Sequence, residues 1–97
     1  MDKRNKSLLL YLAEASDRQL SAFLKIADRD QIYALKEATL NLLLGNVPVS
    51  EEAKKKLKRH KKFLREFAQK GSKVDLKGKA KIIKAILKVA APAVGGI

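Results

Sequence analysis

The chain has 97 residues, room for one compact domain, and 46% of them are hydrophobic, which excludes a purely disordered basic tail. Its 22 lysines and arginines against 10 acidic residues give a net charge of +12, which favours anionic partners such as nucleic acid or an anionic membrane. The absence of cysteine excludes a disulfide framework within the chain, and the single histidine excludes a cluster of zinc ligands of the usual kind.

The positive charge is concentrated in the second half. Residues 1–50 carry 7 basic and 6 acidic side chains, a net charge of +1, whereas residues 51–97 carry 15 and 4, a net charge of +11. The boundary coincides with a turn-rich segment at residues 45–50, where Pro48 disfavours a helical conformation of its predecessor. We predict a helical core unit over residues 1–47, a basic helical unit over residues 48–92 and a flexible tail over residues 93–97, within one domain overall.

The first half predicts two short helices before residue 28. A leucine cluster at residues 8–12 indicates an opening helix. Ser16 followed by Gln19 has the spacing of a capping box, which predicts that a second helix starts there. The apolar residues of that second helix share one helical face: Leu20, Phe23, Leu24 and Ala27.

A third helix is predicted up to Gly45. Asp28 or Asp30 can cap its first turn, and Gly45 is the residue type that ends a helix in a left-handed conformation. Helical spacing places the following residues on its core face: Ile32, Leu35, Thr39, Leu42 and Leu43.

A fourth helix is predicted from Ser50 to about Gln69. Ser50 is a good N-cap, and the two glutamates that follow it complement the helix macrodipole. One arc of this helix is apolar and is expected to pack: Ala53, Leu57, His60, Phe63, Leu64, Phe67 and Ala68. The remaining arc forms what we call the basic ridge: Lys54, Lys55, Lys58, Arg59, Lys61, Lys62 and Arg65.

A fifth helix is predicted after a break at Gly71 and Ser72, beginning between Asp75 and Lys79 and ending before Pro92. Lysines recur on one side of it and form what we call the basic stripe: Lys77, Lys81, Lys84 and Lys88. The opposite side is apolar and is expected to pack: Ile82, Ile83, Ile86, Leu87 and Ala90. The predicted fold class is all-α, a small bundle of four or five helices with a basic C-terminal half.

The basic surfaces predict phosphate binding without base recognition. Lysines spaced four residues apart repel one another along the ridge, and a polyanion would remove that cost. Lysine outnumbers arginine, and asparagine and glutamine are scarce on these faces. Few side chains are therefore available to form bidentate hydrogen bonds with bases. We therefore predict sequence-nonspecific binding of double-stranded DNA by the ridge and the stripe.

The other chemically notable residues have structural interpretations. Phe63 and Phe67 lie on the apolar arc, so core packing is favoured over stacking on unpaired bases. His60 has no second ligand for a metal and no carboxylate at helical spacing, and Asp28 and Asp30 are explained as caps. With no phosphate loop or nucleophile motif, we expect no enzymatic activity, no metal site and no cofactor.

Two alternative functions fit the same residues. Residues 76–92 resemble a cationic amphipathic helix of the kind that lies in anionic membranes, which would make the protein membrane-active. The basic faces would also suit an adaptor that binds an acidic protein. A domain of this size has a narrow stability margin to which a partner can contribute, and we expect the first half to supply the core and a surface for a homodimer.

Three segments resemble a known group of proteins. They read NLLLGNVPVS at residues 41–50, KKKLKRHKKFLREFA at residues 54–68 and KVDLKGKAK at residues 73–81, followed by an apolar end that contains glycine. Together with the order in which they occur, they resemble the small basic proteins of Maverick/Polinton-type elements and adintovirus-like viruses, over about residues 35–97. Those proteins are similar to adenovirus core protein X.

The resemblance implies a virion component that condenses a double-stranded DNA genome and is found in the virion and the host nucleus. This expectation agrees with the charge. In the same setting, the two alternatives become a membrane-active capsid accessory protein that uses residues 76–92 and an adaptor that binds an acidic capsid protein. The chain departs from the group in its tail, where an alanine-rich segment replaces a longer, leucine-rich end.

Overall fold

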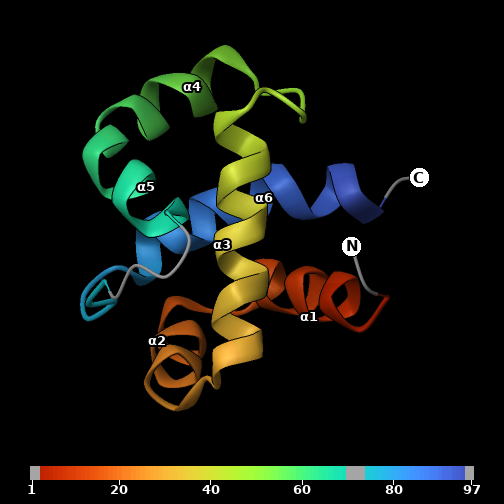
Figure 1. Cartoon of the computed structure of the whole chain (residues 1–97), viewed down its shortest axis with the longest axis vertical. Coiled ribbons are helices and arrows are strands. Elements are labelled where there is room, and N and C mark those ends of the chain that lie inside the picture. Colours follow the sequence, from red (N-terminus) through yellow and green to blue (C-terminus); the bar gives the residue numbers. More distant parts are fainter. Residues whose placement is uncertain (1–2, 70–73, 96–97) are drawn as a thin grey trace.

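The protein is all-helical over the part of the chain that the structure describes. A computed structural model describes residues 3–69 and 74–95, with side chains described for residues 7–69 and 74–90. The order is α1 (Lys3–Glu14), α2 (Asp17–Ile26), α3 (Arg29–Leu43), α4 (Glu51–Lys58), α5 (Lys61–Ala68) and α6 (Ala80–Gly95). The predicted all-α fold is confirmed, although the described residues form six helices rather than four or five (Figure 1).

Reciprocal caps begin α2 and α3. The Ser16 hydroxyl accepts a hydrogen bond from the Gln19 amide at 3.1 Å, and the Ser16 amide donates to the Gln19 side chain at 2.9 Å. Asp28 and Gln31 form the same arrangement at the start of α3. The predicted capping box at Ser16 is therefore confirmed, and Asp28 rather than Asp30 caps the third helix.

Gly45 ends α3 as predicted. Its φ of +75° is in the left-handed region. The Gly45 amide donates to the Leu42 carbonyl at 3.2 Å and the Asn46 amide donates to the Asn41 carbonyl at 3.0 Å, the two bonds of a Schellman motif. This motif turns the chain away from α3 toward Ser50, where the next helix starts.

The last helix, α6, occupies the centre of the bundle. It packs against α1, α2, α3 and α4, and in Figure 1 it passes behind α3. The largest fully buried side chains come from both halves of the chain: Leu9, Leu12, Leu20, Leu35, Thr39, Phe67, Ile83, Ile86 and Leu87. The two halves therefore share one core, and the apolar side predicted for the fifth helix is confirmed as buried.

The predicted fourth helix is divided in two. Arg59 and His60 form a turn between α4 and α5, and His60 has a non-helical backbone, with φ −114° and ψ 23°. An unbroken helix would have carried His60 into the core, and an imidazole without a polar partner is costly to bury. The break leaves His60 exposed, so its predicted place on the packing arc is wrong. It also lets α4 pack on α6 while α5 packs on α3.

The end of the last helix also differs from the prediction. Helix α6 continues past Pro92 to Gly95, so the expected end before Pro92 is wrong, as is the expected absence of helix over residues 93–95. Proline inside a helix removes one amide donor and crowds the carbonyl four residues earlier, which kinks a helix without always ending it, and the neighbouring alanines have the highest helix propensity of any residue. The rest of the predicted tail, residues 96–97, and the predicted break at Gly71 and Ser72 lie outside the described residues.

One residue predicted for the core of α3 lies at the surface. Leu43 is exposed, whereas Leu35, Thr39 and Leu42 are buried as expected and Ile32 is half-buried. The buried Thr39 hydroxyl donates to the Leu35 carbonyl one turn earlier at 2.9 Å, which satisfies its hydrogen-bonding capacity as a donor. Leu43 is turned away because the core face of α3 is centred on Leu35 and Leu42.

Candidate nucleic-acid interface

The basic ridge is built on α4 and α5. The Ser50 hydroxyl accepts a hydrogen bond from the Ala53 amide at 3.2 Å and fixes the start of α4, which supports the prediction for Ser50. Glu51 and Glu52 lie in the first turn and lysines occupy the last, so the charges of α4 complement its macrodipole. Local sequence therefore positions the lysines at the end of this helix.

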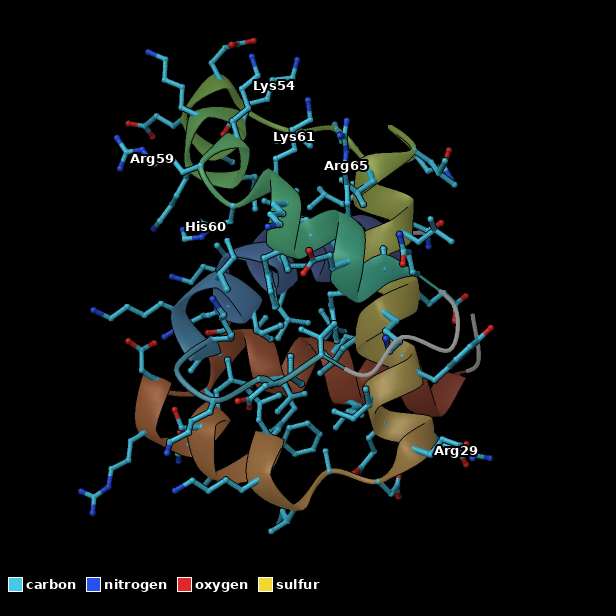
Figure 2. The ribbon with its side chains drawn as sticks, turned by 60° about the vertical axis from the view of Figure 1, so that its left-hand side comes forward. Arg29, Lys54, Arg59, His60, Lys61 and Arg65 are labelled. Atoms are coloured by element: carbon cyan, nitrogen blue, oxygen red, sulfur yellow. The ribbon has the colours of Figure 1, made fainter. Side chains whose placement is uncertain are left out.

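All seven ridge side chains are exposed: Lys54, Lys55, Lys58, Arg59, Lys61, Lys62 and Arg65. Figure 2 shows Lys54, Arg59, Lys61 and Arg65 projecting from the α4–α5 end of the molecule. None of the seven forms an ion pair with a described residue. Glu51, Glu52 and Glu66 lie on the same two helices, but no direct ion pair with a described residue relieves the repulsion between these cations.

Part of the ridge borders an apolar groove. Lys54, Lys58 and Lys61 line a groove of about 450 Å³ between α4, α5 and the end of α3. The groove has no acidic lining residue, and its other lining residues are Leu42, Leu43, Gly45, Val47, Val49, Leu57 and Leu64. The bend between α4 and α5 thus gathers three cations from two helices around one apolar surface.

The basic stripe is only partly as predicted. Lys81, Lys84 and Lys88 belong to α6, but Lys77 lies in the turn that precedes it, so its predicted helical register is wrong. The Lys77 amide donates to the Asp75 carboxylate at 2.9 Å, and Gly78 has a φ of +74°. This Asx-type turn followed by a left-handed glycine delays the start of the helix to Ala80.

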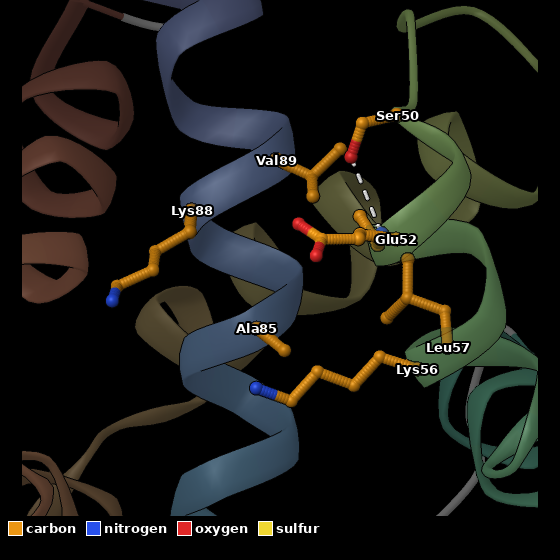
Figure 3. A pocket seen from close by; sticks show the side chains of 8 residues that line it. Ser50, Glu52, Lys56, Leu57, Ala85, Lys88 and Val89 are labelled. Carbon is orange, nitrogen blue, oxygen red and sulfur yellow. Dashed lines mark hydrogen bonds between the residues drawn. The ribbon is translucent and has the colours of Figure 1, made fainter.

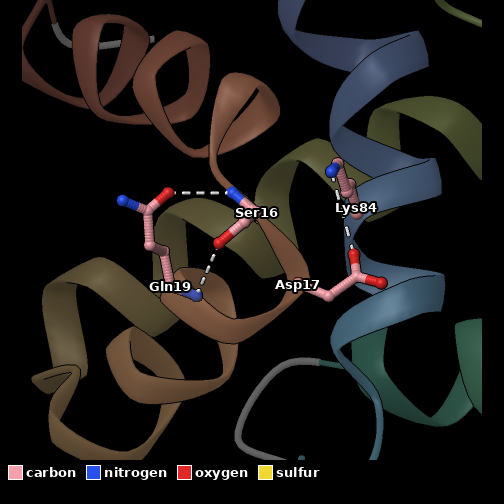
Figure 4. Close-up of polar contacts among 4 residues, drawn as sticks. All are labelled: Ser16, Asp17, Gln19 and Lys84. Carbon is pink, nitrogen blue, oxygen red and sulfur yellow. Dashed lines mark hydrogen bonds and ion pairs between the residues drawn. The ribbon is translucent and has the colours of Figure 1, made fainter.

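Lys84 is engaged within the protein. Its ammonium lies 3.7 Å from the Asp17 carboxylate in the first turn of α2, beside the Ser16–Gln19 capping box (Figure 4). Its side chain is half-buried, whereas Lys77, Lys81 and Lys88 are exposed. Lys84 therefore connects α6 to α2 and offers less free charge than the other lysines of the stripe.

A second groove lies between α4, which carries part of the basic ridge, and α6, which carries most of the basic stripe. Lys56 and Glu52 from α4 and Lys88 from α6 line a groove of about 460 Å³ (Figure 3). Lys56 is exposed and was not part of the predicted interface. Because α4 crosses α6 at this point, Lys56 extends the basic surface toward Lys88, a pairing for which the sequence gives no signal.

The aromatic residues of α5 are packed rather than available for stacking on bases. Phe63 and Phe67 are buried, and their rings stack with centroids 5.7 Å apart. The Lys79 ammonium lies 5.1 Å from the centre of the Phe63 ring and holds the turn before α6 against α5. The predicted core role of both phenylalanines is confirmed.

The described residues offer no constellation for metal binding. They contain no cluster of three or more histidine or acidic side chains placed to hold an ion. His60 is exposed at the start of α5, where its side chain makes no capping hydrogen bond, and Asp28 serves as a cap. Among the described residues, no helix has the length and apolar character needed to cross a membrane.

Comparisons with protein families, curated proteins and solved structures find no match to this chain.

Proposed function

We propose that this protein binds double-stranded DNA without sequence specificity, through the phosphate backbone, and condenses it. The observation that carries this proposal is the basic ridge, in which seven cations are exposed and unpaired among the described residues. Phosphates would supply the direct ion-pair partners that these cations lack among the described residues. Lys56 and the exposed lysines of the stripe, Lys77, Lys81 and Lys88, extend the binding surface.

The size of the ridge suits a duplex. Residues 54–65 extend over at most about 18 Å of helix at 1.5 Å per residue. A duplex carries one charge per ~1.7 Å, so a segment of that length presents about ten phosphate charges, more than the seven ridge cations can neutralise. One molecule therefore covers a short segment, and condensation requires several molecules on the same DNA.

The resemblance to proteins of Maverick/Polinton-type elements and adintovirus-like viruses supports a biological setting for this binding. We propose that the protein is a virion component of a virus or mobile element, acting on the genome in the virion and in the host nucleus. A capsid protein is then its expected protein partner. This setting is supported by the three segments at residues 41–50, 54–68 and 73–81.

The burial of α6 favours DNA over a membrane as the anionic partner. Ile82, Ile83, Ile86 and Leu87 are all buried in the bundle, so the apolar side of α6 reaches lipid only if the fold opens. An adaptor that binds an acidic protein is a second candidate function. The groove lined by Lys54, Lys58 and Lys61 is otherwise apolar, so an acidic protein segment with apolar side chains would fit it.

Fluorescence anisotropy with labelled duplexes of AT-rich, GC-rich and mixed sequence tests the proposal. We expect dissociation constants within a few-fold of one another, because lysine–phosphate contacts carry little base information. Light scattering on long DNA should rise as the protein neutralises it. A strong preference for one duplex, or no binding at low salt, would contradict the proposal.

A further inference from the structure

Helix α3 is apolar on two opposite sides. Its inner side carries Leu35 and Leu42, which are buried in the core. Its outer side carries Tyr33, Leu40 and Leu44, with exposed fractions of 53%, 42% and 63%. At 100° per residue these three residues fall on one line, about half a turn of the helix away from the inner side.

The bundle covers only the inner side of this helix. Figure 1 shows α3 on the near side of the molecule, with no other helix crossing in front of it. A helix that is apolar on opposite sides is typical of one that packs against neighbours on both. We name the line of residues 33, 37, 40 and 44 the outer stripe; its spacing of three and four residues is that of a helix–helix seam.

The outer stripe differs chemically from the proposed DNA-binding surfaces. Glu37 is the only charged residue within it, and the exposed Arg29 lies one turn before Tyr33, at its N-terminal end. A surface with one carboxylate and one cation at its end is close to neutral and has little attraction for phosphates or anionic lipids. Its partner is therefore an apolar surface of similar length, about 16 Å for the eleven steps of 1.5 Å from residue 33 to residue 44.

We propose that two copies of this chain pair through the outer stripes of their α3 helices. The distribution of charge along the chain favours a second copy of this chain as the partner. Helix α3 carries two basic and two acidic residues, a net charge of zero, whereas residues 51–97 carry +11. Two copies that meet at α3 keep their strongly basic surfaces apart, and a two-fold axis lets each stripe cover the other. The added burial also supports a domain whose size leaves it a narrow stability margin.

Pairing through α3 leaves the basic ridge uncovered. In Figure 2 the labelled ridge residues project from the α4–α5 end, while α3 runs along another side of the molecule down to Arg29. A dimer would thus present two ridges and could bridge two duplex segments. This consequence rests on the proposed function, whereas the pairing itself does not and is measured without DNA.

Sedimentation velocity across a dilution series, in DNA-free buffer with enough salt to screen the repulsion between molecules, tests the pairing. We expect a concentration-dependent dimer. Leu40→Glu and Leu44→Glu should each raise the dimer dissociation constant at least about tenfold, because they place repelling charges in an apolar seam. Ile26→Glu is the matched control, since Ile26 is 83% exposed and lies on α2; this variant should dimerise normally. Melting curves check that each variant folds.

The absence of cysteine allows a second, independent measurement. Single-cysteine variants Leu40→Cys and Ile26→Cys are treated with a short bis-maleimide. We expect rapid cross-linking of Leu40→Cys and slow cross-linking of Ile26→Cys. A chain that stays monomeric at every concentration overturns the pairing, as does equal cross-linking at both sites. A dimer that fails to bind DNA would refute the proposed function and leave the pairing intact.

Discussion

The Lys36 ammonium on α3 lies 2.9 Å from the carbonyl oxygen of Phe67 on α5 and 4.9 Å from the centre of the Phe67 ring. Phe67 is in the last turn of α5, where carbonyl groups lack helical partners and a cation is favoured by the macrodipole. Lys36 thus holds the C-terminal end of α5 against α3. This contact helps to orient the helix that carries the second half of the basic ridge.

Lys36→Met should lower the free energy of unfolding by about 1.5–3 kcal/mol, the usual contribution of a hydrogen bond made by a charged group. The methionine keeps the packing against Phe67 and removes the donor. Lys25→Met is the matched control, because Lys25 is exposed on α2, and it should change stability by less than about 0.5 kcal/mol. Urea denaturation followed by circular dichroism measures both; equal stabilities would show that the contact contributes nothing.

Desolvation by burial lowers the pKa of Lys36 from its usual value. Between the folded-state pKa and the higher unfolded-state pKa, the unfolded chain therefore binds more protons than the folded one at this residue. Stability then rises with pH through that alkaline window. As pH rises through this window, the free energy of unfolding of the unmodified protein should increase relative to that of Lys36→Met. Urea midpoints of the two proteins at stepped alkaline pH test this sign, and a relative loss would contradict the burial argument.

The ridge should dominate the salt dependence of DNA binding. Changing Lys54, Lys58 and Lys61 together to glutamine should flatten the plot of log K against log salt by up to about 2.7, at roughly 0.9 per lost phosphate contact. The control triple has the same change in charge but replaces exposed residues of the first half: Arg18, Lys25 and Arg29. It should leave the slope almost unchanged. Equal effects of the two triples would mean that net charge, rather than the ridge, governs binding.

The local features of the fold were predictable from sequence because short-range chemistry determines them. The helix caps act on backbone groups only a few residues away. The predicted roles of Ser16 with Gln19 and of Ser50 as N-caps, and of Gly45 as the end of α3, are confirmed. The break at His60 was not predicted, because helical periodicity alone placed that residue on the packing arc. The cost of burying an imidazole beside Leu57 and Leu64 favours the break, and helical periodicity does not include that cost.

The composition of the basic surfaces was likewise predictable, but their arrangement was not. Exposure of the seven ridge side chains follows from their charge. Two of the observed contacts involve residues more than thirty positions apart in the sequence. Lys84 forms an ion pair with Asp17, and Lys56 lines the same groove as Lys88. Such contacts depend on how α6 packs against α2 and α4, and periodicity within one helix carries no information about them.

Gly45→Ala should destabilise the protein by about 1–2 kcal/mol, the cost of a left-handed conformation for a residue with a Cβ atom. The added methyl group itself meets nothing within 4 Å, so the effect is backbone strain alone. Gly45→Asn should cost less, because asparagine tolerates this conformation better. Thermal melts of the three proteins should follow the order glycine, asparagine, alanine. An alanine variant as stable as the parent would argue against the Schellman motif.

The membrane and DNA functions make different demands on Ile83, which is 1% exposed in the core. Ile83→Val removes one methylene without adding polarity, so its unfolding free energy should fall by about 1 kcal/mol if the side chain packs in the bundle. For a domain of this size that corresponds to a melting temperature lower by roughly 4–8 °C. DNA affinity at low temperature should not change, because the ridge is untouched. An unchanged melting temperature, together with leakage of anionic vesicles by the folded parent protein, would instead mean that this side of α6 serves a membrane.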